Sequence, residues 1–241
     1  QRRLFPHLAT IYATHFGLHY LTRRFLEKTE EEMQEIEALA AGLKAYSTWS
    51  TTAILQECRE ACGGKGYLSE NRIDDLKNDT EIYTTFEGDN TVLMQLVAKN
   101  RLSEFRKEFG KMNSLGLINY VFENTKTALS EKNPIVTRTT EAAHLLDFEF
   151  HLQAFQYREK TILASAAKRI KRLIDEGLEP YDAFNVVQHH MIEVAQAYLE
   201  RILLEQFHEN ISQVQDQAIQ AVLKQLAQLF ALSVIEKNKA W

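Results

Sequence analysis

The sequence predicts an all-α protein. Only 3 prolines and 9 glycines interrupt 241 residues, and they fall at the natural breaks between segments. Between these breaks, apolar side chains recur at the spacing that places them on one face of a helix. No segment shows an alternation of apolar and polar residues strong enough to predict a sheet. Long helices are therefore expected along the chain.

The first three helices are predicted from this spacing and from residues that end helices. Residues 3–27 carry the pattern of one helix. Thr29, with acidic residues behind it, is a typical N-cap and predicts a second, antiparallel helix through Leu43. A third pattern covers residues 47–62 and stops at Gly63-Gly64, because glycine suits the backbone conformation at a helix C-terminus.

A polar stretch separates these helices from the next one. Residues 67–87 are predicted to form short segments, with Asn78-Asp79 as a turn signal. Asp89 or Asn90 is predicted to cap a helix that runs through Phe109, because both side chains can accept hydrogen bonds from the first backbone N–H groups.

The second half is predicted to form a helical bundle. Residues 111–133 are less periodic and end at Pro134, which is typical of a connector. We therefore expect two domains, residues 1–110 and 111–241. The three long helical patterns beyond Pro134 and the residues that mark their turns are 139–175, 181–207 and 213–237, with Gly177 and Pro180 at the first turn and Asn210 near the second.

Composition excludes several classes of function. The formal net charge of −5 gives no electrostatic case for nucleic-acid binding, and the basic run 168–172 is better explained as a solvated helix face. Cys58 and Cys62 lie one helical turn apart, a poor geometry for a disulfide, and are expected to be reduced. No apolar run approaches the ~20 residues of a membrane span, so none is expected. The start lacks Met and lies inside a helical pattern, which suggests a fragment of a longer protein.

Two short segments carry the strongest functional signal. They are Cys62-Gly63-Gly64-Lys65-Gly66-Tyr67-Leu68 and Thr84-Thr85-Phe86-Glu87-Gly88-Asp89-Asn90-Thr91-Val92-Leu93. In the second, Glu87 lies between a bulky apolar residue and a glycine, where apolar neighbours can desolvate it, a plausible setting for a general base. In the first, the glycines follow a helix and lack the G-x-G-x-x-G spacing, so a dinucleotide-binding fold is not expected.

These segments, together with Glu57-Cys58-Arg59-Glu60-Ala61, closely resemble the acyl-CoA oxidases, flavin enzymes of the acyl-CoA dehydrogenase superfamily. The resemblance continues in Leu4-Phe5-Pro6 and, more diffusely, over residues 141–211. It implies a four-helix-bundle-like C-terminal domain followed by the second helical-bundle domain found in oxidases. The amino-terminal helical domain and the central β domain of the family have no counterpart in the sequence.

The resemblance also implies a reaction. Glu87 would remove the α-proton of a fatty acyl-CoA while FAD accepts a hydride from the β-carbon, giving a trans-2-enoyl-CoA. The backbone N–H of Glu87 would polarise the thioester carbonyl. The remaining implied residues are Phe86 and Gly88 along the acyl and thioester region, Asp89, Asn90 and Thr91 near flavin oxygens, and Glu60, Gly63 and Gly64 against the FAD of a neighbouring subunit.

Further properties follow from the same resemblance. We expect a homodimer, and a fragment that is inactive without the absent domains. Lys65 stands where eukaryotic oxidases usually carry His, and Asn71-Arg72-Ile73 is more like bacterial relatives. The chain ends without a peroxisomal Ser-Lys-Leu signal. A bacterial cytoplasmic protein is therefore expected, or a peroxisomal one if the source is eukaryotic. Oxidase and dehydrogenase activities both remain possible.

Other hypotheses rest on different residues. A helical scaffold without catalysis is one, although the intact Glu87 motif argues against it. Two Glu-x-x-His pairs have the spacing of di-iron bundles, which also need two further inward glutamates; the candidates are Glu141 with His144, Glu205 with His208, and Glu123 and Glu193. His15 and His19 could bind zinc, but no third ligand completes the set, and adjacent His189-His190 make a poor chelate. We therefore expect no metal.

Overall fold

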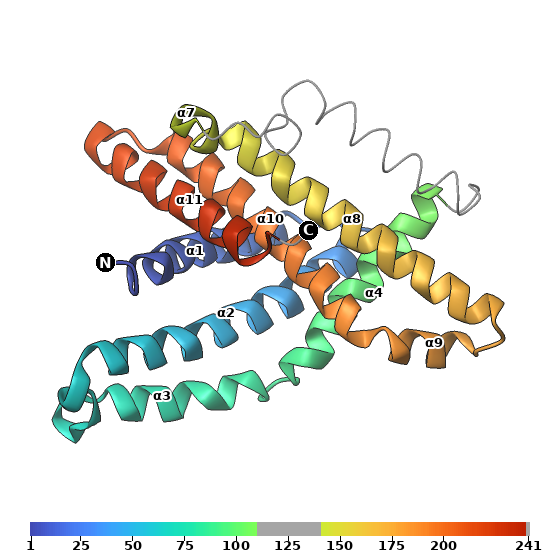
Figure 1. The fold of residues 1–241 in the computed structure, drawn as a ribbon, viewed down its shortest axis with the longest axis horizontal. Helices are drawn as coiled ribbons and strands as arrows, with labels where there is room; N and C mark the ends of the chain where they lie inside the picture. The colour runs from blue at the N-terminus through green and yellow to red at the C-terminus, as the bar shows by residue number, and fades with distance from the viewer. Residues whose placement is uncertain (110–140, 240–241) are drawn as a thin grey trace.

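The computed structural model describes residues 1–109 and 141–239, and every regular element in them is helical (Figure 1). The all-α prediction is confirmed. The long helices are α1 (Phe5–Glu27), α2 (Met33–Ala61), α4 (Asn90–Phe109), α8 (Phe148–Asp175), α10 (Gln188–Gln213) and α11 (Gln217–Lys237). The shorter elements are η1 (Gly63–Tyr67), η2 (Ser69–Asn71), α3 (Ile73–Glu81), η3 (Ile82–Thr84), α7 (Ala142–Leu145) and α9 (Pro180–Val186).

The predicted break after Leu43 is wrong, because α2 continues through it. Residues 44–46 contain neither glycine nor proline, and the Thr48 hydroxyl donates to the Lys44 carbonyl oxygen (2.9 Å) within the unbroken helix. The helix begins at Met33 rather than at Thr29. Thr29 still contributes to the turn before the helix, since its backbone N–H and its hydroxyl both donate to Glu32 Oε2. The predicted stop at Gly63 is confirmed, with φ +58° there.

The later helices follow the predicted order, but the single helices predicted over 139–175 and 181–207 are each divided, between α7 and α8 and between α9 and α10. Gly177 adopts φ +99° and Pro180 begins α9, which confirms the first turn. Asn210 does not end a helix as predicted, because α10 runs to Gln213 and the Asn210 amide donates to the Gln206 carbonyl oxygen. The second turn lies beyond it, where Asp216 caps α11 by accepting from two backbone N–H groups.

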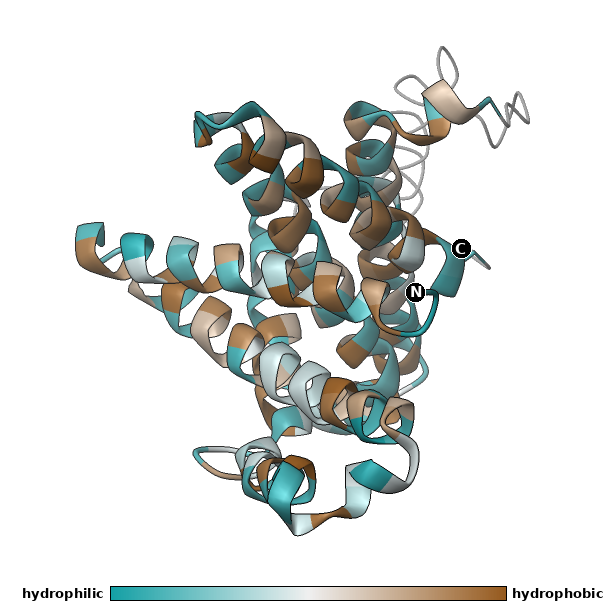
Figure 2. Cartoon of the chain, turned by 90° about the vertical axis from the view of Figure 1, so that its left-hand side faces the viewer, coloured by the Kyte–Doolittle hydropathy of each residue, from teal (hydrophilic) through white to brown (hydrophobic). Residues whose placement is uncertain are grey.

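Helix α10 forms the centre of the core. It packs against α1, α2, α4, α8 and α11 (Figure 1), and a single hydrophobic cluster joins the helices on both sides of the chain's midpoint. In Figure 2 the helices carry both hydrophobic and hydrophilic residues along their length. The predicted boundary near Pro134 lies outside the described residues, so the division into two domains stays a prediction. The fully buried residues of α10 include Met191, Val194, Ala195, Leu199, Leu203, Leu204 and Phe207.

Charged side chains are buried between α8 and α10. Arg158, only 6% exposed, pairs with Glu200, which is 2% exposed and also accepts from Gln196. Nearby, Glu159 accepts from Arg101 of α4 and from Arg201 of α10. A buried charge without a partner is unfavourable, so these pairs fix how the three helices align.

An arm extends from this bundle. The C-terminal half of α2 and α3 run side by side away from the other helices, and η1 and η2 join them at the tip (Figure 1). The chain then returns along α3 and η3 to the start of α4. The predicted turn at Asn78-Asp79 is wrong, because α3 continues through both residues. The two segments with the strongest functional signal both lie on this arm, one at its tip and one at its base.

Helix α11 is longer and more apolar than expected, since no segment was predicted to be long and apolar enough to span a membrane. By length and composition alone it could cross a membrane, and it is the one helix in the described part of the chain that passes this test. A single helix of this kind is weak evidence for a membrane span, because core helices of soluble proteins can have the same length and composition. In the structure α11 packs against α1, α8 and α10.

Candidate functional site

The Glu87 turn has an unusual backbone conformation. Glu87 adopts φ +56° and Gly88 adopts φ +113° between the end of η3 and the start of α4. A positive φ is uncommon for a residue with a side chain and costs about 1–2 kcal/mol. At Gly88 an added Cβ would also lie 3.1 Å from Leu93 Cδ2. Side-chain-bearing residues in such conformations persist only where the surroundings hold them, and they cluster at functional sites.

Helix α2 supplies the groups that hold this turn. Lys44 Nζ donates to the Gly88 carbonyl oxygen (2.8 Å) and to Asn90 Oδ1 (2.9 Å). Asn90, only 1% exposed, donates its amide to Thr48 Oγ1 (2.8 Å) and to the Ala45 carbonyl oxygen. These partners are more than 40 residues away in sequence, so no local pattern could have revealed Lys44 or Thr48 as part of the site.

The side chains around the turn are exposed in this chain. Glu87 is exposed, and Phe86 beside it is 52% exposed. Tyr83 and Phe86 lie edge to face with ring centroids 6.3 Å apart. Apolar neighbours are therefore present, as the sequence predicts, but within the described residues they leave the Glu87 carboxylate open to solvent.

The first turn of α4 is capped by its own side chain. Thr91 donates its N–H to Asp89 Oδ1 (2.9 Å), which confirms the predicted cap at this helix start. Asn90 is buried as a whole residue, and its side chain is committed to α2. The backbone N–H of Glu87 donates no hydrogen bond to any other residue that the structure describes.

The glycine turn at the tip of the arm has two different kinds of glycine. Gly66 is buried, and a Cβ there would overlap the Arg59 carbonyl oxygen. Gly63 and Gly64 face open space, with no atom of the described chain within 4 Å of an added Cβ. The positive φ explains Gly63. Nothing within the described chain explains why Gly64 lacks a side chain.

Glu60 lies one turn before these glycines. Its carboxylate accepts from the Gln56 amide (2.6 Å) and from the Arg3 guanidinium, which also binds Glu57. The Gln56 hydrogen bond, and after it the Arg3 hydrogen bond, lower the pKa of the Glu60 carboxyl below its usual range. The predicted contact between Glu60 and a flavin stays a prediction.

The structure does not bring the predicted site residues together in one place. The group at residues 86–91 and the group at residues 60–64 lie at opposite ends of α3. The 9 residues of α3 alone span about 14 Å. A single cofactor that touched both groups of one chain would have to extend along the whole arm.

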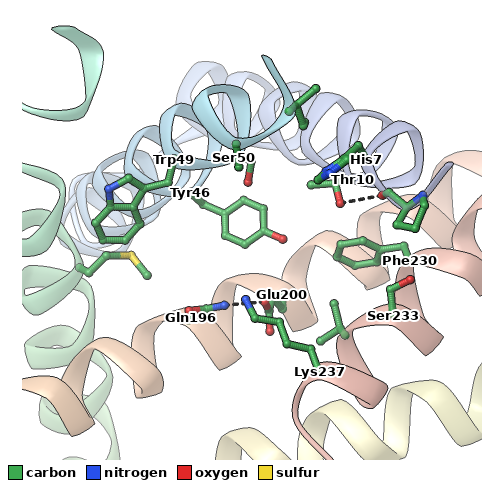
Figure 3. Close-up of a pocket in the computed structure, with 15 residues that line it drawn as sticks. His7, Thr10, Tyr46, Trp49, Ser50, Gln196, Glu200, Phe230, Ser233 and Lys237 are labelled. Atoms are coloured by element: carbon green, nitrogen blue, oxygen red, sulfur yellow. Dashed lines mark hydrogen bonds between the residues drawn. The ribbon is translucent and has the colours of Figure 1, made fainter. Parts of the chain in front are cut away.

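A cavity that the sequence did not predict lies elsewhere, among α1, α2, α10 and α11. Its volume is about 370 Å³, and Figure 3 shows the Tyr46 hydroxyl pointing into it between Phe230 and Trp49. The buried Glu200 carboxylate and the Lys237 side chain also line it. Glu87 does not line this cavity, so the cavity is separate from the turn described above.

The metal-binding alternatives find no supporting geometry. No three His, Cys, Asp or Glu side chains gather at one point within residues 1–109 and 141–239. Glu205 is held by Arg201 through both oxygens, and His208 stacks on Phe148 with ring centroids 3.6 Å apart. His15 and His19 contact each other on α1. Glu123, a candidate ligand, lies outside the described residues.

Comparisons with known proteins give a consistent result. The family described as "Acyl-CoA oxidase, C-alpha1 domain" matches residues 1–102, and "Acyl-CoA oxidase" matches residues 147–240. The peroxisomal acyl-coenzyme A oxidase 2 of Arabidopsis thaliana is 38% identical over 99% of the chain. The crystal structure of acyl-CoA oxidase1 from Yarrowia lipolytica covers the whole chain with a TM-score of 0.79 and 28% identity. Acyl-CoA oxidase-1 of Caenorhabditis elegans, solved with FAD and ATP, shares the fold with a TM-score of 0.81 at 21% identity, also over the whole chain.

These relatives are longer than the chain and come from eukaryotes. The chain spans 35% of the Arabidopsis protein, 37% of the Yarrowia structure and 36% of the nematode one. The plant relative is described as peroxisomal. The expectation of a bacterial cytoplasmic protein, drawn from Lys65 and residues 71–73, therefore finds no support.

Proposed function

Because the chain is a helical C-terminal part of the acyl-CoA oxidase family, we propose that it supplies the general base of an FAD-dependent acyl-CoA oxidase. The complete enzyme would convert a fatty acyl-CoA into its trans-2-enoyl-CoA in fatty acid β-oxidation. The observation that carries this proposal is the Glu87 turn: an exposed carboxylate on a backbone that α2 holds in an unfavourable conformation. The plant relative supports a peroxisomal location for the enzyme.

In this proposal Glu87 acts through two groups. Its carboxylate accepts the α-proton of the thioester, and its backbone N–H donates to the thioester carbonyl oxygen, where negative charge develops. That the N–H has no other acceptor in the described chain supports the second role. Phe86 and Gly88 line the acyl and thioester region. Burial of Glu87 by the acyl chain and by other parts of the enzyme would make the carboxylate a stronger base.

We propose that FAD contacts the chain in two separate places. When bound, FAD accepts the hydride from the β-carbon and passes the electrons to oxygen. The open space beside Gly63 and Gly64 allows another molecule to approach the backbone there, with Glu60 one turn away. At the other end of α3, Asp89, Asn90 and Thr91 present the start of α4. Helix N–H groups at such a position suit phosphate or ribose oxygens.

A homodimer accounts for the separation of these two places. The tip of one arm would contact the flavin whose reactive ring lies beside Glu87 of the partner subunit. One chain then need not bring residues 60–64 and 86–91 together. The dimer and the absent domains would also cover apolar side chains that this chain leaves exposed on α1, among them Phe5, Leu8, Ile11, Leu18, Phe25 and Leu26.

An absorbance spectrum of the full-length enzyme tests the proposal. Oxidised flavin bands should bleach when a long-chain acyl-CoA is added without oxygen. Rapid return of the bands in air would establish an oxidase, and slow return a dehydrogenase. A protein that neither contains flavin nor takes it up would rule out the enzyme activity and leave a non-catalytic scaffold as the better hypothesis.

Two glycine variants separate folding of the arm from cofactor binding. Gly66→Ala should destabilise the tip by about 1–3 kcal/mol, because its Cβ overlaps the Arg59 carbonyl oxygen. Gly64→Ala should leave the tip intact and weaken FAD binding by about tenfold in the full-length enzyme. Hydrogen exchange at residues 63–81 measures the first effect, and flavin titration of the apoenzyme measures the second. Unchanged FAD affinity in Gly64→Ala would remove the tip from the cofactor site.

A further inference from the structure

We propose that Lys44 is a positioning residue for the base Glu87. The proposal rests on the function proposed above for Glu87 and adds a group that the sequence motif does not contain. Lys44 lies in the middle of α2, 44 residues from its partner Gly88. It contacts the turn through its ammonium group, and it acts on the reaction only through the position of Glu87.

A single ammonium group spans the turn. Lys44 Nζ donates to the Gly88 carbonyl oxygen at 2.8 Å and to Asn90 Oδ1 at 2.9 Å. The two acceptors stand on either side of Asp89, so both ends of this short segment are tied to one point. Hydrogen bonds from a charged donor are about twice as strong as those between neutral groups.

The second acceptor is itself fixed. The Asn90 amide donates to Thr48 Oγ1 and to the Ala45 carbonyl oxygen, and its side chain is buried. Residues on either side of Lys44 belong to the core, since Leu43 and Ala45 are fully buried. The ammonium group therefore projects onto the turn from a part of α2 whose neighbouring residues are packed in the core.

The backbone needs such a restraint. Glu87 has a positive φ, which its side chain disfavours, so in a free turn it would relax toward more favourable values. Relaxation would move both catalytic groups of Glu87, because its carboxylate and its N–H share one residue. A shift of about 1 Å at a reacting group can cost about 10²-fold in rate. Lys44 opposes that shift.

The test compares Lys44→Met with the wild type in the full-length flavoenzyme. Methionine retains an unbranched apolar stem but has no ammonium group. We expect kcat to fall by about 10- to 100-fold, with the KM for acyl-CoA within about threefold of wild type. The primary isotope effect with α-deuterated acyl-CoA should rise, because proton removal becomes slower than the other steps. Lys44→Arg, which keeps the charge, should recover part of the rate.

The matched control is Lys99→Met, an exposed lysine on α4, which should behave as wild type. If Lys44→Met fails to fold or to retain flavin, Lys44→Gln is judged by the same rate and isotope effect. Wild-type kcat and isotope effect in a folded Lys44 variant would overturn the positioning role. A wild-type enzyme whose flavin does not bleach with acyl-CoA would instead overturn the proposed function of Glu87.

Discussion

Glu87→Gln in the full-length enzyme is expected to lower turnover of acyl-CoA by about 10²- to 10⁴-fold or more, while FAD content and fold stay unchanged. Glutamine has nearly the same shape but cannot take up the α-proton. It retains the backbone N–H, so the thioester should still bind. The Glu87 side chain is exposed and forms no hydrogen bond or ion pair with another described residue.

Anaerobic stopped-flow measurement of flavin bleaching isolates this effect, because it follows the chemical step alone. Glu30→Gln removes an exposed carboxylate in the turn before α2, far from Glu87 in sequence; it is the control and should bleach like wild type. Near-wild-type bleaching by Glu87→Gln would show that another group is the base. The Lys44 proposal would then lose its premise as well.

Glu200→Leu is expected to destabilise the chain by about 3–5 kcal/mol. The substitution leaves the Arg158 guanidinium buried without its main partner, since Glu193 is the remaining carboxylate, 3.7 Å away and half-exposed. Two Arg158 nitrogens, Nε and Nη2, already lack a hydrogen bond within the described chain. Urea denaturation followed by circular dichroism measures the loss.

A double-mutant cycle distinguishes a lost ion pair from lost packing. Arg158→Met combined with Glu200→Leu should recover most of the stability, because the two apolar side chains can pack where the charges met. Glu193→Leu is the control. It removes a half-exposed carboxylate from the same cluster and should lower the free energy of unfolding only slightly. If the double variant is as unstable as the sum of the single variants, burial of the unpaired charge is not the cause.

The sequence was sufficient for the local features of the fold. Proline, glycine and capping residues placed most helix ends, since these residues act on their own backbone. Gly63 ended α2 and Asp89 with Asn90 began α4, as predicted. The prediction failed at positions where the sequence pattern indicated a helix end but the helix continued. Residues 44–46 were predicted as a break and Asn210 as a turn, yet neither segment contains a residue that prevents helix formation.

The tertiary structure decided which residues support the site and which charges pair in the core, because the residues that interact there are far apart in the sequence. Glu87 and its flanking motif could be identified from sequence, because the chemistry resides in neighbouring residues. Lys44, which holds the turn, and the Arg158–Glu200 pair became visible only when helices brought together residues more than 40 positions apart. The distance between residues 60–64 and residues 86–91 is likewise set by the tertiary structure. The resemblance assigned residues 60–64 to the FAD of a neighbouring subunit, and α3 separates the two groups within a single chain.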